Sequence, residues 1–323
     1  ARRSALRAQG KGMKNPFEDL PGYEDSAIPQ MLSDAKKSMT AEKEKKLEEN
    51  RLGVQEAMKR ASLVPETFEQ SVLWCIAAIL DSAKARVFEQ RVLFDAGDDG
   101  TNAFAQVLPF AEQVCRSLAQ IKGSDGGRVS VIFSDMGSQA SAQDQWSDLP
   151  DNIALAYMPV VRDGNVEPSE AVERQCEFLA DADVVISICA GQEEAMPCTW
   201  LASIAKKKSV PFVMINPTLI TDINSMAGMR ARAVRQFERR VRDVFYLKQH
   251  EPEEREDLMS GVVTRIWPRD FSIWEDAPDD PDSVNGFFLL ELEEEEPLDS
   301  QVLDLLRQSK AVRGKFDTPS WMR

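Results

Sequence analysis

The segment RVSVIFS, residues 128–134, is a short apolar run with several β-branched residues, and it leads directly into Asp135 and Gly137. Comparable runs predict further strands at 91–95, 153–158, 183–188 and 210–215. The segments between them predict helices at 101–121, 138–146, 170–181, 193–207 and 225–242. Apolar strands that alternate with helices indicate a parallel sheet covered on both faces. We therefore predict the α/β class, with a Rossmann-like, mostly parallel sheet.

The two ends of the chain differ from this alternating part. Short runs at 262–267, 271–274 and 287–292 predict antiparallel strands at the edge of the sheet, followed by a helix at 298–308. Residues 1–60 predict a flexible arm and a solvated helix, which together form a helical N-terminal extension. We expect a single α/β domain over residues 61–310 and a loose tail over 311–323.

Composition excludes several classes of function. The chain has 323 residues with 39 Lys and Arg against 54 Asp and Glu, a net charge of −15, which argues against broad nucleic-acid binding. His250 is the single histidine, so histidine-based metal sites and a Ser-His-Asp triad are disfavoured. The five cysteines contain no CxxC pair and are expected to be reduced thiols in the core. The longest apolar run, 72–80, is about half of the ~20 residues that span a bilayer, so we expect no transmembrane segment and at most peripheral membrane contact.

The first 15 residues are basic. They carry five Lys and Arg residues and no acid. Such a segment is typical of organelle transit peptides or their remnants. The alternative is that this segment is only the end of a fragment and has no targeting role.

Small and polar residues follow the predicted strands. They are Asp95, Asp135, Gly137, Gly191 and Asn216. In an open α/β sheet, ligands bind outside the carboxyl ends of the strands, so these residues are candidates for binding a nucleotide or another small molecule. The alternative is ordinary turn and capping chemistry.

Catalytic and metal chemistry find little support near these strand ends. Asp98 and Asp99 join Asp95 in one loop, where clustered carboxylates favour Mg²⁺ over phosphate. No phosphate-binding G-x-x-x-x-G-K-[ST] motif occurs, and Cys189 lacks a nearby base that the sequence would place. We therefore expect turn chemistry at this loop and assign no catalytic residue, metal or cofactor.

The predicted helix at 225–242 carries a stripe of arginines. Arg232, Arg235, Arg239 and Arg242 fall in one arc at 100° per residue. The stripe would suit an anionic headgroup or an acidic partner. The alternative is a solvated face that the acidic segments 251–257 and 291–296 partly neutralise.

Four segments together resemble a plastid and cyanobacterial family, the domain of unknown function nineteen-ninety-five. The matching residues are Phe133-Ser-Asp135-Met-Gly137 with Ala142 and Trp146, then Ile215-Asn216-Pro217, then the basic helix running into Val244–Lys248, then Trp267-Pro268 with Phe271 and Trp274. The resemblance covers roughly residues 62–310. It departs from the usual pattern at Ser134, where the family more often has proline.

The resemblance implies a role and a location, but no reaction. The family includes the "low photosystem II accumulation" assembly factors, so it implies a chloroplast protein of the stroma or of the stromal thylakoid face. Its partner would be a thylakoid membrane complex, with photosystem subunits as the expected contacts. A related domain is fused behind some plastid adenylate kinases, which keeps a nucleotide- or small-molecule-binding role, including an enzymatic one, as an alternative. A permanent structural subunit of a larger complex is the third reading.

Overall fold

The computed structural model describes the residues that form the predicted α/β domain. These are residues 56–95, 103–121, 127–159, 181–219, 229–250, 260–278 and 283–317, with the single residues 170, 176 and 179 between them. The chain divides into two compact units, residues 1–59 and 60–323. Of the first unit, residues 56–59 are described and are helical.

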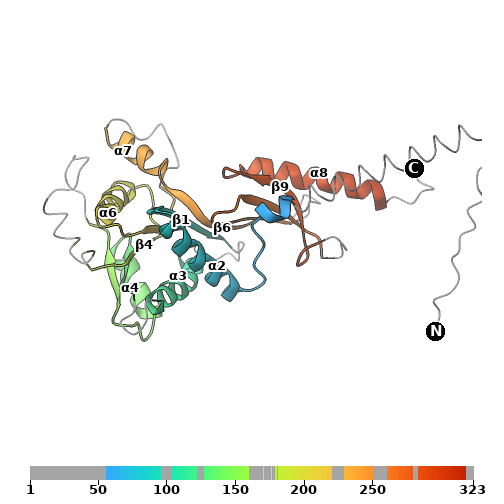
Figure 1. Ribbon diagram of the computed structural model, residues 1–323. Coiled ribbons are helices and arrows are strands. Elements are labelled where there is room, and N and C mark those ends of the chain that lie inside the picture. The colour runs from blue at the N-terminus through green and yellow to red at the C-terminus, as the bar shows by residue number, and fades with distance from the viewer. Residues whose placement is uncertain are drawn as a thin grey trace, which may run out of the picture. The chain divides into compact units, whose positions relative to one another are not determined.

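The second unit is built on one nine-stranded sheet (Figure 1). Its strands lie in the order β3-β2-β4-β5-β1-β6-β7-β8-β9. The pairs from β3 through β6 are parallel, and those from β6 through β9 are antiparallel. This confirms the predicted α/β class and its antiparallel C-terminal extension. The bounds are β1 Glu89–Asp95, β2 Val129–Phe133, β3 Ile153–Tyr157, β4 Val184–Ile188, β5 Phe212–Ile215, β6 Arg242–His250, β7 Gly261–Ile266, β8 Phe271–Asp276 and β9 Phe287–Glu293.

Among the described helices, three cover one face of the sheet and three cover the other (Figure 1). The first three are α2 (Phe68–Lys84), α3 (Ala103–Gln120) and α4 (Met136–Gln145). The second three are α6 (Ala195–Lys207), α7 (Met229–Glu238) and α8 (Asp299–Asp317). None of the described helices is long and apolar enough to cross a bilayer.

Aromatic side chains fill the first face. Phe94 of β1 stacks on Phe110 of α3 with 4.1 Å between ring centroids, and Phe245 of β6 lies 6.1 Å from Phe110. Trp146 ends α4, as its spacing predicted, and packs edge-on against Phe133 of β2 at 5.9 Å. Because strand side chains alternate between faces, the neighbours of Phe94 and Phe245 point to the opposite side.

Two separate apolar clusters fill that opposite face. Under α6 and α7, Val234 and Phe237 pack with Phe212 and Met214 of β5. Under α8, Val302 and Leu306 pack with Tyr246 of β6. None of the described helices therefore lies above the part of the sheet between these two clusters.

Residue Ser62 ties the start of the second unit to the antiparallel strands. Its hydroxyl donates to the Asp270 carbonyl at 3.0 Å and accepts from the Ile266 N–H at 2.8 Å. Its carbonyl accepts from Thr264 Oγ1 and from Trp274 Nε1 at 3.0 Å. We call this buried set of bonds the Ser62 clamp.

Two predicted helix ends are wrong, and one predicted helix is untested. The helix predicted to end at residue 242 ends at Glu238, and Arg242 instead begins β6, whose backbone pairs with Gln90 of β1. The last helix continues to Asp317, past its predicted end at 308, so the first part of the predicted loose tail is helical. The helix predicted at 170–181 lies mostly outside the described residues, as does the arm over 1–55.

Candidate functional site

The sheet order brings the predicted crevice residues to one edge. Strands β2, β4, β5 and β1 are consecutive in the sheet and parallel, so their carboxyl ends lie side by side. Asp135 follows β2, Gly191 follows β4, Asn216 follows β5, and Asp95 ends β1. Whether a ligand binds there depends on what these groups already contact.

Asp135 is the N-cap of α4. Its carboxylate accepts from the Ser138 N–H at 2.9 Å and from the Ser138 hydroxyl at 3.0 Å. These hydrogen bonds, the backbone bond first, hold the pKa of Asp135 below its ordinary value. A Cβ on Gly137 would lie 3.0 Å from the Asp135 carboxylate, so the glycine leaves room for the cap. The predicted capping role is confirmed for Asp135.

Asn216 joins the ends of β5 and β1. Its side-chain oxygen accepts from the Phe94 N–H, and its side-chain nitrogen donates to the Phe94 carbonyl, each at 2.7 Å. The residue has φ of 48°, a left-handed conformation that Asn tolerates better than most residues. Both ends of the amide are thus engaged by the backbone of β1.

The turn after β4 is also closed by local contacts. Glu194 accepts from the Gly191 N–H at 2.8 Å. Burial raises the pKa of the Cys189 thiol to about 11, so the thiol form dominates at neutral pH and the nucleophilic thiolate is scarce.

Asp95 lies beside His250 at the end of β1. Its charge acts on His250, whose pKa is nevertheless lowered by burial and by Lys248. Asp98 and Asp99, the other members of the proposed carboxylate loop, lie outside the described residues. Within the described part of the chain, no group of three or more potential metal ligands comes together.

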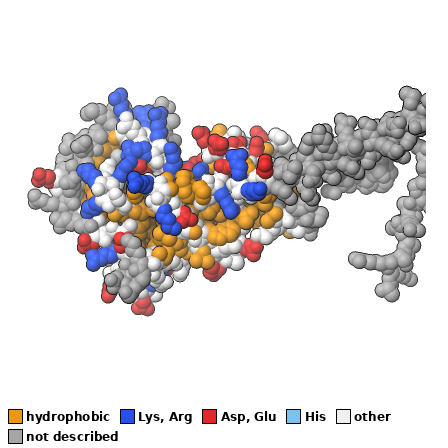
Figure 2. Space-filling view, viewed as in Figure 1, with side chains coloured by type: hydrophobic (Ala, Val, Ile, Leu, Met, Phe, Trp, Pro, Cys, Tyr) orange, Lys and Arg blue, Asp and Glu red, His pale blue; other side chains and the backbone are white. Residues whose placement is uncertain are grey.

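The four predicted arginines lie on one exposed surface, although they do not share one helix. Arg232 and Arg235 are on α7, Arg239 is in the following turn, and Arg242 begins β6. The Arg242 guanidinium donates to the Arg239 carbonyl at 3.3 Å, which keeps the two neighbours together. Figure 2 shows Lys and Arg side chains gathered over the part of the molecule formed by α6 and α7.

Lysines at the end of α6 extend this surface. Glu89 of β1, whose side chain is 7% exposed, accepts from Arg240 at 2.9 Å and pairs with Lys206 at 3.4 Å. Glu89 thereby holds the end of α6 next to the turn after α7. The basic surface is defined here as Lys206, Lys207, Lys208, Arg232, Arg235, Arg239, Arg240 and Arg242, all of which are exposed. No local sequence pattern links the lysines to the arginines, because Glu89 lies more than a hundred residues before both.

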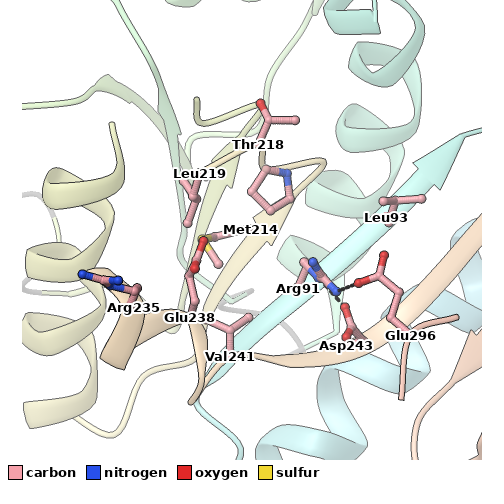
Figure 3. Close-up of a pocket in the computed structure, with 11 residues that line it drawn as sticks. Arg91, Leu93, Met214, Thr218, Leu219, Arg235, Glu238, Val241, Asp243 and Glu296 are labelled. Atoms are coloured by element: carbon pink, nitrogen blue, oxygen red, sulfur yellow. Dashed lines mark hydrogen bonds and ion pairs between the residues drawn. The ribbon is translucent and has the colours of Figure 1, made fainter. Parts of the chain in front are cut away.

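A groove of about 600 Å³ opens next to the basic surface, on the α6–α8 face of the sheet (Figure 3). Leu93 of β1 and Met214 of β5 line it, together with the loop that follows β5. Arg235 and Glu238 line it from α7. The opposite lining consists of Arg91 of β1, Asp243 of β6 and Glu296, which follows β9 (Figure 3). None of the residues predicted at the strand ends lines this groove.

Arg91, one of the arginines that line the groove, is already neutralised. Arg91 forms ion pairs with Asp243 and Glu296. Burial alone would lower the pKa of Arg91, but the hydrogen bonds and charges of Asp243 and Glu296 outweigh burial and raise it above its ordinary value. Burial, followed by the charge and hydrogen bond of Glu296, raises the pKa of the neighbouring Tyr246.

The chain belongs to a family whose biochemical activity is not defined. The family model described as "Domain of unknown function (DUF1995)" matches residues 65–302, which confirms the predicted resemblance. No curated protein matches the chain. The match covers all nine strands of the sheet and begins three residues after Ser62.

Proposed function

We propose that this DUF1995 protein is a non-catalytic plastid protein that docks onto thylakoid photosynthetic complexes or their assembly intermediates. The contact would be made by the basic surface, and the partner would present an acidic protein face. Its location would be the stroma or the stromal side of the thylakoid membrane, as the resemblance to photosystem assembly factors implies.

The observation that carries this proposal is the concentration of positive charge on a negatively charged chain. The protein has a net charge of −15, yet eight exposed cations gather at the end of α6, on α7, in the turn that follows α7 and at the start of β6. The described helix α6 contains no acid, and α7 contains one, Glu238, which is half-buried. A local field of opposite sign to the whole molecule orients and accelerates the approach of an acidic partner.

A protein partner fits this surface better than a bilayer does. Peripheral helices that bind membranes place large apolar side chains beside their cations. Among the described residues, the exposed large apolar side chains lie outside α6 and α7; they are Phe68, Leu73, Ile121, Met136, Tyr157 and Leu298. The basic surface therefore offers charge without an apolar anchor.

Charge reversal tests the proposal. The variant Arg232→Glu/Arg239→Glu/Arg242→Glu changes three exposed side chains of the basic surface and leaves Arg235 in place. A matched control, Lys84→Glu/Arg128→Glu/Arg307→Glu, makes the same change in net charge at exposed residues elsewhere, each in a surface ion pair that contributes little to stability.

The readout is recovery of photosystem subunits from solubilised thylakoids by the full chain. The wild type and the control variant should recover the same subunits, while the triple variant of the basic surface should lose roughly tenfold or more, since reversed charges repel where they attracted. Recovery of no photosystem subunit by the wild type would contradict the proposal, as would full recovery by the triple variant. Size-exclusion of native extracts separates a transient factor from a permanent subunit.

A further inference from the structure

The groove beside α7 is open because two helices stop short of each other. Val234 and Phe237 hold α7 over β5, and Val302 and Leu306 hold α8 over β6 and the strands beyond it. Met214 belongs to the cluster under α7 and Leu93 packs against the cluster under α8, and both line the groove where the two clusters face each other (Figure 3). Its volume of about 600 Å³ falls within the range of pockets that hold small molecules.

The floor and one end of the groove are apolar. Leu93 is partly exposed, while Met214 and Leu219 are buried at its base, and Val241 adds an aliphatic side chain from the turn before β6. An aliphatic or flat apolar body of a ligand would remove the exposed parts of Leu93 and Val241 from water, which is favourable by roughly 25 cal/mol per Å².

Among the described acids that line the groove, Glu238 is the one whose carboxylate forms no ion pair. It is the last residue of α7, and its half-buried side chain lines the groove (Figure 3). Among the described residues, none forms a hydrogen bond or ion pair with this carboxylate. Arg235 lies one turn earlier on α7, but it donates its Nε–H to the Ala231 carbonyl of the same helix at 3.2 Å. Burial raises the pKa of Glu238, although the charge of Arg91 opposes the rise. A partly desolvated carboxylate without a donor is a group that a ligand can stabilise.

The charges inside the groove favour a cation over an anion. Arg91 is shared between Asp243 and Glu296. Glu238 adds a third carboxylate and Arg235 a second guanidinium, so the described lining carries three negative charges against two positive ones. A phosphate or carboxylate entering the groove would meet these acids, whereas an ammonium group would gain a charge-assisted hydrogen bond. The groove therefore differs in sign from the basic surface next to it and does not suit a nucleotide.

We propose that this groove binds a small amphipathic molecule that carries one protonated amine. The ammonium group would donate to Glu238, and the apolar body would lie over Leu93 and Met214. This site goes beyond the proposed docking function. Its binding groups Glu238, Leu93 and Met214 are not part of the basic surface, so either proposal can fail without the other.

A series of matched six-carbon probes tests the charge and the apolar body together. Hexylammonium, hexan-1-ol and hexanoate share one chain and differ in the charge of the head group. Binding to the full chain is followed by the methyl resonance of Met214 in protein labelled at methionine methyl groups, with Met214→Leu used to assign it. Hexylammonium should shift this resonance saturably and bind at least tenfold more tightly than hexan-1-ol, while hexanoate should bind most weakly.

Two variants connect the result to Glu238. Glu238→Gln should weaken hexylammonium binding at least tenfold and leave hexan-1-ol binding unchanged, while Glu193→Gln, at an exposed acid before α6, should bind hexylammonium as the wild type does. Equal affinity for hexylammonium and hexanoate would overturn the proposal, and so would an unshifted Met214 resonance or a Glu238→Gln variant that binds like the wild type. The comparison of the three probes on the wild type needs no variant, so a folding defect of Glu238→Gln would not obscure the outcome.

Discussion

Replacing Asn216 by alanine should destabilise the sheet where β5 meets β1. The substitution removes two hydrogen bonds of 2.7 Å to the backbone of Phe94 and leaves that N–H and carbonyl without their side-chain partner. A hydrogen bond to a partly buried backbone group contributes about 1–1.5 kcal/mol, so the pair contributes about 2–3 kcal/mol. The left-handed φ of 48° adds about 1 kcal/mol for alanine, which tolerates it poorly. We expect a loss of about 3–4 kcal/mol in the free energy of unfolding.

Related substitutions separate the two contributions. Asn216→Asp keeps the acceptor for the Phe94 N–H but loses the donor to its carbonyl, so it should lose about half of the hydrogen-bond contribution. Asn285→Ala is a matched control, because Asn285 is exposed and has φ of 55° without a described side-chain hydrogen bond. It should lose only the conformational contribution of about 1 kcal/mol.

Urea unfolding followed by tryptophan fluorescence measures these differences, provided that the slope with denaturant stays the same across the variants. If Asn216→Ala is no less stable than Asn285→Ala, the hydrogen bonds to Phe94 contribute nothing, and the reasoning is refuted. In that case the Asn216 amide would again be available to a ligand in the crevice.

Three further predictions concern stability. Ser62→Ala removes the two hydroxyl bonds of the Ser62 clamp and should lower the free energy of unfolding by about 2–3 kcal/mol in urea titrations; a loss below about 0.5 kcal/mol would contradict it. Gly261→Ala should cost about 1–3 kcal/mol in the same assay, because the new Cβ would lie 2.8 Å from the Trp274 carbonyl oxygen; wild-type stability would show that the backbone moves freely there. His250 has a lowered pKa in the folded state, so the unfolded state binds its proton more readily and stability should fall as pH drops below about 6.5. The variant His250→Gln should show a weaker fall over this pH range, and an identical profile would assign the effect to other groups.

The parallel part of the fold was predictable because its signals are local. Apolar, β-branched runs placed β2 and β4 within a residue or so of their observed bounds. Asp135 stood three residues before the Ser138 N–H that it caps, which is the spacing of an N-cap. Such signals depend on neighbours along the chain and need no knowledge of the tertiary structure.

The boundary between α7 and β6 was not predictable from local signals. No Gly or Pro separates Glu238 from Arg242, so the helical spacing of apolar residues continues through the turn. The strand begins at Arg242 because its backbone pairs with Gln90 of β1, some 150 residues earlier. Pairing of this kind outweighs local propensity.

The groove could not be predicted for a related reason. Its lining comes from separate segments of the chain that include Arg91, Met214, Glu238 and Glu296. No motif or spacing connects them, and only the sheet order and the gap between α7 and α8 bring them together. The strand-end residues, in contrast, were identifiable as candidates but are largely occupied by backbone contacts.

The Ser62 clamp has a consequence for any fragment of this family that is chosen by its sequence boundary. A fragment beginning at residue 65, where the family match starts, would lack Ser62. It would therefore lose the hydrogen bonds that Ser62 accepts from Trp274 Nε1, Thr264 Oγ1 and the Ile266 N–H. The Thr264 hydroxyl and the Ile266 N–H would then lose their acceptor at once, while Trp274 Nε1 would keep only its hydrogen bond to Thr264 Oγ1 at 3.0 Å. Fragments that begin a few residues earlier should express and refold better, because they keep Ser62 and its hydrogen bonds.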